Sequence, residues 1–395
     1  MGGFVTSAEV ARELFDWQRN LPALFAKQGH CGLIQAPPGA GKTLAAIQVI
    51  KSLSPCRVDI VAPLAMLVKQ WEHVLAQERV EASLWTTIGI VRAVERGEMR
   101  GTDLLILDEA HQTSSEVYSK VYDIPHKYLL GLTATPSEGC IERLGQPFLI
   151  VPWDEARISP FEVEFVLVSL SRWERARYEK YTDEIRKVSV DRRRVERSIA
   201  NPPFGTTREQ MEATARALEQ RVFQLAIWRR HLVHLSAAKV SATVQCVVAA
   251  VDAGHKVMVF AERIKQLQQI ADLLGLAGVK YSELHSKKAR GFEQFRAGTI
   301  RVLLSSKMVK QGYDDPSVDV GIVASFALTS TSHVQTLGRV VRWLEGKERA
   351  KIYYLLAAGT TDERVMEHTK FYSGTGKFEF RVTDWAGSRV PGNLV

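Results

Sequence analysis

A glycine-rich stretch between an apolar run and a helical pattern is the strongest chemical signal in the sequence. It reads Ala36-Pro37-Pro38-Gly39-Ala40-Gly41-Lys42-Thr43, follows the run 32–35 and opens a helical pattern over 43–53. Backbone N–H groups of such a loop can surround phosphates at the positive end of a helix. Lys42 would reach the β- and γ-phosphates, and the Thr43 hydroxyl would ligate Mg²⁺. The alternative, a turn that happens to precede Lys-Thr, fits this strand–loop–helix context poorly. The predicted nucleotide contacts are Pro38, Gly39, Ala40, Gly41, Lys42 and Thr43.

Two adjacent carboxylates follow another apolar run, about 65 residues beyond Lys42. Asp108 and Glu109 end the run 104–107 and begin Asp-Glu-Ala-His, which closes at His111. Asp108 is suited to hold Mg²⁺ through water, and Glu109 is suited to orient and activate the water that attacks a phosphate. Such a tetrapeptide alone often only starts a helix. Its place after a strand and a phosphate loop favours the catalytic interpretation.

A glutamine and two arginines recur near the C-terminal end at spacings of four and three residues. Gln335, Arg339 and Arg342 therefore share one face of a predicted helix. Two guanidinium groups on one face suit a γ-phosphate that another part of the chain presents. The alternative is a basic helix face in solvent.

Short apolar runs that alternate with helical patterns indicate two α/β blocks. Alternating β and α elements imply parallel sheets with helices on both faces. A middle stretch of different character opens with an alternating segment, 161–170, and then becomes helical and rich in charge. The runs are 32–35, 58–62, 104–107 and 128–132 in the first block and 256–261, 302–305, 320–324 and 352–356 in the second.

The order of the motifs resembles that of superfamily 2 helicases of the DEAD/DEAH type. The motifs are Gln18, 36–43, 108–111, 133–135 and 335–342. Their spelling is most similar to DNA translocases related to the large TFIIH translocase subunit and to phage UvsW-like branch-migration helicases. Kinases and GTPases share the phosphate loop but lack the second block. The resemblance implies two RecA-like lobes with ATP and Mg²⁺ in the cleft and nucleic acid bound across both lobes.

We therefore expect a first, ATP-binding lobe over residues 1–151 and a second lobe over 240–370. Between them, residues 152–239 would form a largely helical, charge-rich linker or insertion that contacts nucleic acid. Residues 371–395 would form a C-terminal tail.

The resemblance also assigns roles to residues outside the strongest motifs. Arg339 and Arg342 would act as arginine fingers, joined by Gln335. Gln18 would read the adenine base, although Phe15 and Trp17 stand where the family often has Arg and Tyr. The residues that would face the nucleotide from the second lobe are Gly312 and Asp314, and those that would contact the nucleic-acid track are Pro63, Thr87 and Ser306.

Composition supports a core-forming protein with a polyanionic partner. Apolar residues make up 46% and charged residues 24% of the 395 residues, and the formal net charge is +8. Four separated cysteines form no CxxC pair, which indicates a reducing compartment. With no signal peptide or long apolar run visible, we expect a cytoplasmic or nucleic-acid-associated protein with no membrane partner.

A basic cluster in the middle stretch suggests where DNA would bind. Arg192, Arg193 and Arg194 follow one another on a helical pattern, and such clusters neutralise phosphates without reading bases. A solvated helix surface is the alternative. The spelling of the motifs favours DNA, whether duplex, branched or single-stranded, over RNA. An RNA helicase, or an ATP-gated motor subunit with protein partners, stays open at this point.

Overall fold

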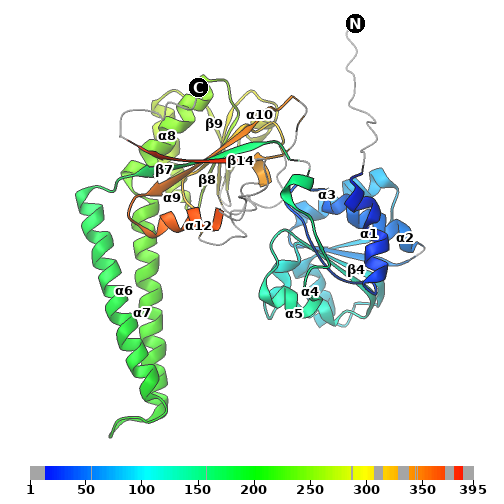
Figure 1. Ribbon diagram of the computed structural model, residues 1–395, viewed down its shortest axis with the longest axis horizontal. Helices are drawn as coiled ribbons and strands as arrows, with labels where there is room; N and C mark the ends of the chain where they lie inside the picture. Colours follow the sequence, from blue (N-terminus) through cyan, green and yellow to red (C-terminus); the bar gives the residue numbers. More distant parts are fainter. Residues whose placement is uncertain are drawn as a thin grey trace.

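The computed structural model describes residues 14–54, 56–156, 158–285, 288–306, 315–327, 338–342, 344, 346–369 and 378–385. It shows two α/β lobes and a long helical hairpin that extends away from the second lobe (Figure 1). Both lobes are built on parallel sheets, so the predicted fold class is confirmed.

The first lobe holds a six-stranded sheet in the order β3-β2-β4-β5-β1-β6, and all of its pairings are parallel. All four runs expected in this block form strands. The elements are α1 (Asp16–Lys27), β1 (Cys31–Gln35), α2 (Lys42–Leu53), β2 (Val58–Ala62), α3 (Ala65–Glu78), β3 (Ser83–Thr86), α4 (Thr87–Glu95), β4 (Thr102–Asp108), β5 (His126–Thr133), α5 (Glu138–Leu144) and β6 (Leu149–Ile150).

Strand order brings three motifs of the first lobe to one edge. β5 lies between β4 and β1, with Asp108 opposite Leu132 and Gln35 opposite Thr133. Because parallel strands end at the same edge of a sheet, the loops after Gln35, Asp108 and Thr133 must lie close together.

The second lobe holds an eight-stranded sheet in the order β10-β9-β11-β8-β12-β13-β7-β14. It is parallel except for the β9–β10 pair. Helices α8 and α9 bury apolar side chains against one face of this sheet. The elements are β7 (Phe161–Val168), α8 (Ala237–Asp252), β8 (Val257–Ala261), α9 (Ile264–Leu276), β9 (Tyr281–His285), β10 (Lys288–Arg290), α10 (Phe292–Arg296), β11 (Val302–Ser306), β12 (Val320–Val323), β13 (Ala350–Ala357), α12 (Val365–Thr369) and β14 (Phe378–Asp384).

The second sheet extends beyond the range 240–370 expected from the sequence. β7, from the predicted linker, pairs with β13, and β14, from the predicted tail, pairs with β7. Buried carboxylates on β7 help to hold β14: Arg381 Nε lies 3.0 Å from Glu162, and the Thr383 hydroxyl donates to Glu164 over 2.7 Å. The alternating pattern identified the strand, but a pattern does not say which sheet a distant strand joins.

The rest of the middle stretch is a helical hairpin of α6 (Arg172–Ser198) and α7 (Arg208–His234), which pack along each other. Each helix begins with a capping box, Ser171 with Glu174 and Thr207 with Gln210, which satisfies the first free N–H groups. At 27 residues each, the helices are about 40 Å long. The hairpin leaves and re-enters the second lobe through β7 and α8 (Figure 1).

No single helix within the described ranges has the length and apolar character that a membrane crossing requires, and only the bent pair of α7 and α8 passes such a test jointly.

Candidate nucleotide-binding site

The glycine-rich loop joins β1 to α2 in a conformation that glycine makes accessible. Gly39 and Gly41 have φ angles of +82° and +87°, in the left-handed region that side chains rarely adopt. A Cβ atom added to Gly41 would also lie 2.3 Å from the side-chain nitrogen of Gln18. The loop therefore presents its backbone at the N-terminus of α2, where N–H groups favour anions.

Lys42, the first residue of α2, folds back into the hollow of this loop. Its ammonium donates to the carbonyl oxygens of Ala36 and Pro37 over 3.0 and 3.1 Å. Desolvation lowers the pKa of Lys42, and the nearby carboxylates of Glu109 and Asp108 oppose that shift. A cation enclosed by carbonyls at a helix N-terminus is placed to meet phosphate oxygens. Thr43 follows it, half-buried, in the first turn of α2.

The two carboxylates lie at the end of β4, next to the loop. Asp108 accepts the backbone N–H of Glu109 over 3.0 Å and the indole N–H of Trp71, on α3, over 2.9 Å. Burial, and then the charge of Glu109, raise the pKa of Asp108 to about 6. Glu109 itself has a φ of +50°, which is unusual for a residue with a side chain and typical of functional sites.

These residues fit a divalent cation. Oε2 of Glu109 is buried and lies 3.4 Å from His111 Nδ1, but it accepts no hydrogen bond from a described residue. Burial, and then the crowding by the second carboxylate, Glu109, raise the pKa of Asp108. A cation held by Thr43 and Asp108 would offset the repulsion between the two carboxylates. Mg²⁺ with water and phosphate ligands suits such a small protein donor set.

His111 connects the carboxylates to the third strand end. Its Nδ1 lies 3.0 Å from the hydroxyl of Thr133 and 3.4 Å from Glu109, and the Thr133 hydroxyl accepts the N–H of Thr135 over 3.2 Å. Burial, and then the charge of Lys42, lower the pKa of His111 to about 4, so the ring is neutral at pH 7. These contacts join Glu109, the residue predicted to activate water, to the Thr133–Thr135 segment.

The second lobe reaches the same loop. A Cβ atom added to Gly338 would come within 2.2 Å of Pro38, and one added to Gly39 would lie 3.5 Å from Cδ of Arg342. The charge of Arg342 also contributes to the lowered pKa of Lys42. The structure thus brings Arg342 together with Lys42, Asp108 and Glu109. Arg339 is half-buried in the same short segment.

Lys347 holds the backbone of the Arg342 segment. Its ammonium donates to the carbonyls of Val340 and Arg342 over 2.6 and 3.3 Å and to those of Pro316 and Val318 over 3.2 and 2.6 Å. Ser159, in the connection between the lobes, donates to Val341 and Arg342 from the other side. Lys347 therefore positions the arginine through its main chain.

Gln18 contacts the loop rather than an open cavity. The side chain is 2% exposed, its amide donates to the carbonyls of Ala40 and Gly41, and its oxygen accepts the N–H of Phe15. The geometry shows Gln18 fastening α1 to the phosphate loop, and its reading of adenine stays a prediction.

The other residues predicted to contact nucleic acid or nucleotide differ in how exposed they are. Pro63 is half-buried after β2, whereas Thr87 and Ser306 are each 5% exposed, and the Thr87 hydroxyl lies 3.5 Å from the carbonyl of Ala62. Their contact with nucleic acid stays a prediction. Gln335, Gly312 and Asp314 lie outside the described residues.

Sequence reasoning missed two residues of this site. Trp71 belongs to no motif, and the apolar run before Asp108 gave no sign of an indole donor to that carboxylate. Lys347 lies in a loop between helical and strand patterns and carries no motif. Both act on a site residue from a distant part of the chain, which a linear pattern does not show.

Two family models match the chain, one on each lobe. Residues 238–344 match the helicase conserved C-terminal domain. Residues 8–100 and 91–138 match the family described as type III restriction enzyme, res subunit.

Curated relatives align over most of the chain. A putative DNA 3'-5' helicase Rad25 of Haloarcula marismortui is 23% identical over 93% of this chain and 56% of its own length. The DNA 3'-5' translocase XPB2 of Sulfurisphaera tokodaii is 26% identical over 89% of this chain and 83% of its own length. The chain thus spans little more than half of the haloarchaeal relative.

Solved structures share the fold at low sequence identity. The helicase domain of Pyrococcus furiosus Hef aligns over 91% of this chain and all of its own, with a TM-score of 0.55 and 15% identity. Saccharomyces cerevisiae Dbp5 bound to RNA aligns over 95% of this chain and 90% of its own, with a TM-score of 0.63 and 12% identity. The motif order, the two RecA-like lobes and both family models place the chain in superfamily 2 of the helicases.

Proposed function

We propose that the protein is an ATP-dependent motor that translocates along DNA and separates or remodels it. The observation that carries the proposal is the shared site, where Arg342 of the second lobe lies over Gly39 in the phosphate loop of the first. A nucleotide bound there would contact both lobes. Its hydrolysis would therefore change the contact between the lobes, which is what a two-lobed motor requires.

Each residue of the site has a distinct part in phosphoryl transfer. Lys42 and the loop N–H groups bind the phosphates, and Glu109 accepts a proton from the attacking water. Arg342 stabilises the negative charge that develops on the transferred phosphoryl group. Thr43, and Asp108 through water, would hold Mg²⁺, which would supply positive charge to neutralise the β- and γ-phosphates.

DNA is favoured over RNA by the extent of the sequence matches. The relatives named as DNA helicases or translocases align over 84% to 94% of the chain. Relatives named as RNA helicases align over only 22% to 33% of it. The names of the former also support movement in the 3′-to-5′ direction.

ATPase rates measured with single-stranded DNA, duplex DNA, forked DNA and RNA test this proposal. We expect DNA to stimulate hydrolysis and RNA to stimulate it less. Displacement of a protein block from single-stranded DNA with one free end would give the direction. Equal rates with and without every nucleic acid would contradict the proposed motor.

A further inference from the structure

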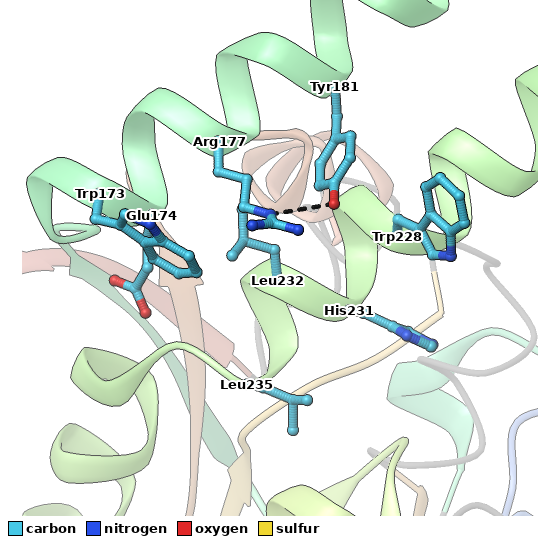
Figure 2. Close-up of a pocket in the computed structure, with 8 residues that line it drawn as sticks. All are labelled: Trp173, Glu174, Arg177, Tyr181, Trp228, His231, Leu232 and Leu235. Atoms are coloured by element: carbon cyan, nitrogen blue, oxygen red, sulfur yellow. Dashed lines mark hydrogen bonds between the residues drawn. The ribbon is translucent and has the colours of Figure 1, made fainter.

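A cavity of about 570 Å³ lies at the base of the helical hairpin, outside the nucleotide site (Figure 2). Aromatic side chains line it, Trp173 and Tyr181 from α6 and Trp228 from α7. Trp173 is 63% exposed and Trp228 is 38% exposed. Because exposing such large rings to water is unfavourable, open aromatic faces around a hollow are typical of a binding site.

The rings and one guanidinium group form a continuous row. The Arg177 guanidinium lies 5.4 Å from the ring centre of Trp173 and 5.7 Å from that of Tyr181, and its Nε donates to the Tyr181 hydroxyl over 3.2 Å. The ring centres of Tyr181 and Trp228 are 6.2 Å apart. Figure 2 shows Trp173, Arg177, Tyr181 and Trp228 one after another beside the two helices, with His231 below Trp228. Planar groups in such a row offer faces for stacking.

The surroundings of the cavity are positively charged. Its one carboxylate, Glu174, is already used, since it accepts the backbone N–H groups of Ser171 and Ala237. Burial, and then the charges of Arg263 and Arg230, lower the pKa of His231. A ligand with a planar ring and negative charge therefore fits better than a purely apolar one.

Arg263 follows the carboxyl end of β8 and lies close enough to His231, which lines the cavity, for its charge to lower the pKa of that ring. It lies two residues beyond Ala261, which pairs with Ser306, a predicted contact to nucleic acid. Nε of Arg263 is buried and has no hydrogen-bond partner among the residues that the structure describes. A partly desolvated guanidinium at this edge is suited to a phosphate oxygen.

We propose that this cavity binds unpaired nucleobases of single-stranded DNA, one stacked on Trp173 and the next on Trp228, while a phosphate of the same strand meets Arg263. Stacking of bases on aromatic side chains, next to cations that follow the backbone, is the chemistry of single-strand binding without sequence preference. The inference rests on the proposed function and adds to it a contact that duplex DNA cannot make, because its bases are stacked on one another.

Replacing both tryptophans by leucine tests the inference, since leucine keeps apolar bulk but removes the flat face. Binding of the full chain would be measured by fluorescence anisotropy with oligothymidylate, with an abasic oligonucleotide of equal length and with duplex DNA. The Trp173→Leu/Trp228→Leu variant should bind oligothymidylate roughly tenfold to a hundredfold more weakly. Its affinity for the abasic strand and for duplex DNA should not change.

Two control variants separate stacking from altered folding. Trp173→Phe/Trp228→Phe keeps aromatic faces and should restore most of the affinity. Phe223→Leu removes another exposed aromatic ring of α7, outside the cavity, and should change nothing.

The outcomes distinguish this inference from the proposed function. Unchanged oligothymidylate affinity in the leucine variant, or an equal loss with the abasic strand, would overturn the cavity as a base-binding site. If the unmodified protein still binds duplex DNA and hydrolyses ATP faster with it, the proposed motor survives that result. A protein that binds no nucleic acid of any kind would overturn both.

Discussion

The nucleotide site and the helical hairpin hold their charged side chains in different ways. At the site, the ammonium of Lys42 is fixed by two loop carbonyls, and Asp108 is fixed by a backbone N–H and an indole. On the hairpin, Arg192 contacts the side chains of Glu219 and Glu196 at 3.3 and 3.6 Å near the surface. Exposed pairs of this kind contribute only about 0–1 kcal/mol.

The difference shows what fixes each geometry. Strand order places the loops after β1, β4 and β5 together, so the fold itself positions the groups predicted to be catalytic. The hairpin arginines are positioned only by the packing of two helices against each other. We therefore expect changes at the site to have large effects on the rate and changes of the hairpin arginines to have small effects on binding.

The largest effect is expected for Glu109→Gln. Glutamine keeps the size of the side chain but cannot accept the proton of the attacking water, so turnover should fall by roughly 10³ or more while ATP still binds. Phosphate release and equilibrium binding of labelled ATP measure the two quantities. Glu98→Gln, a surface exchange on the same lobe, is the control. Hydrolysis at the normal rate would contradict the role of Glu109.

Arg342→Ala should lower kcat by roughly 10³ with little loss of nucleotide affinity, because a finger acts mainly on the transition state. Single-turnover hydrolysis and nucleotide titration would show this. Arg301→Ala, in the same lobe but bonded to Gly254, serves as the matched control. If thermal stability falls and the rate per folded molecule does not, Arg342 is structural and the shared site is wrong.

The sequence predicts those residues of the site that lie in short local motifs, and it misses those held by contacts between distant parts of the chain. The phosphate loop, Asp108 and Arg342 were predicted because each lies in a short motif whose neighbours set its geometry. Trp71 was not predicted, since its contact with Asp108 joins α3 to β4 across 37 residues. β14 was expected to be a tail for the same reason: its pairing with β7 depends on residues more than 200 positions away.

The pH dependence of stability tests the buried His111. Its pKa is about 4 in the folded protein against 6.5 for an unperturbed ring, so the unfolded chain takes up this proton first as the pH falls. Stability should therefore decrease between pH 6.5 and 4, by up to about 3 kcal/mol from this group.

His111→Gln isolates that contribution. Asp108 has a raised pKa, which acts in the opposite sense, but it is present in both proteins. Thermal unfolding of both between pH 7.5 and 5 is the measurement, and the variant should lose less stability on acidification. Parallel curves would show that the ring is not held neutral.

A smaller effect is expected for Trp71→Phe, which removes one hydrogen bond to Asp108 and keeps most of the packing. We expect kcat to fall about tenfold, since a bond to a charged group contributes about 1.5–3 kcal/mol. The hydrogen bond from Trp71 lowers the pKa of Asp108, so its loss raises that pKa. The acid limb of the pH–rate profile should therefore also move to higher pH.

Trp85→Phe is a closely matched control. The Trp85 indole donates to the buried Asp59 over 2.6 Å on the neighbouring strands, away from the phosphate loop. It should lower stability without moving the pH–rate profile. Equal shifts in both variants would mean that Trp71 acts only through the stability of the lobe.

The smallest effect is expected on the hairpin, where Arg192, Arg193 and Arg194 were predicted to contact DNA. If all three met phosphates, their replacement by alanine would reduce the slope of log affinity against log salt by about 3 for duplex DNA. Arg192 is engaged by Glu219 and Glu196, and Arg194 lies 3.6 Å from Asp191. Arg193 is exposed and forms no ion pair with another described residue. We therefore expect the triple variant to reduce the slope by about 1 and Arg193→Ala alone to account for most of that change, whereas Arg192→Ala should have almost no effect on the slope.

Binding to duplex DNA across a salt series measures the slope of all three variants, with ATPase activity in the absence of DNA as the control. An unchanged slope in the triple variant would leave the cluster as a solvated surface, and a loss near 3 would show that the acidic partners exchange freely for phosphates.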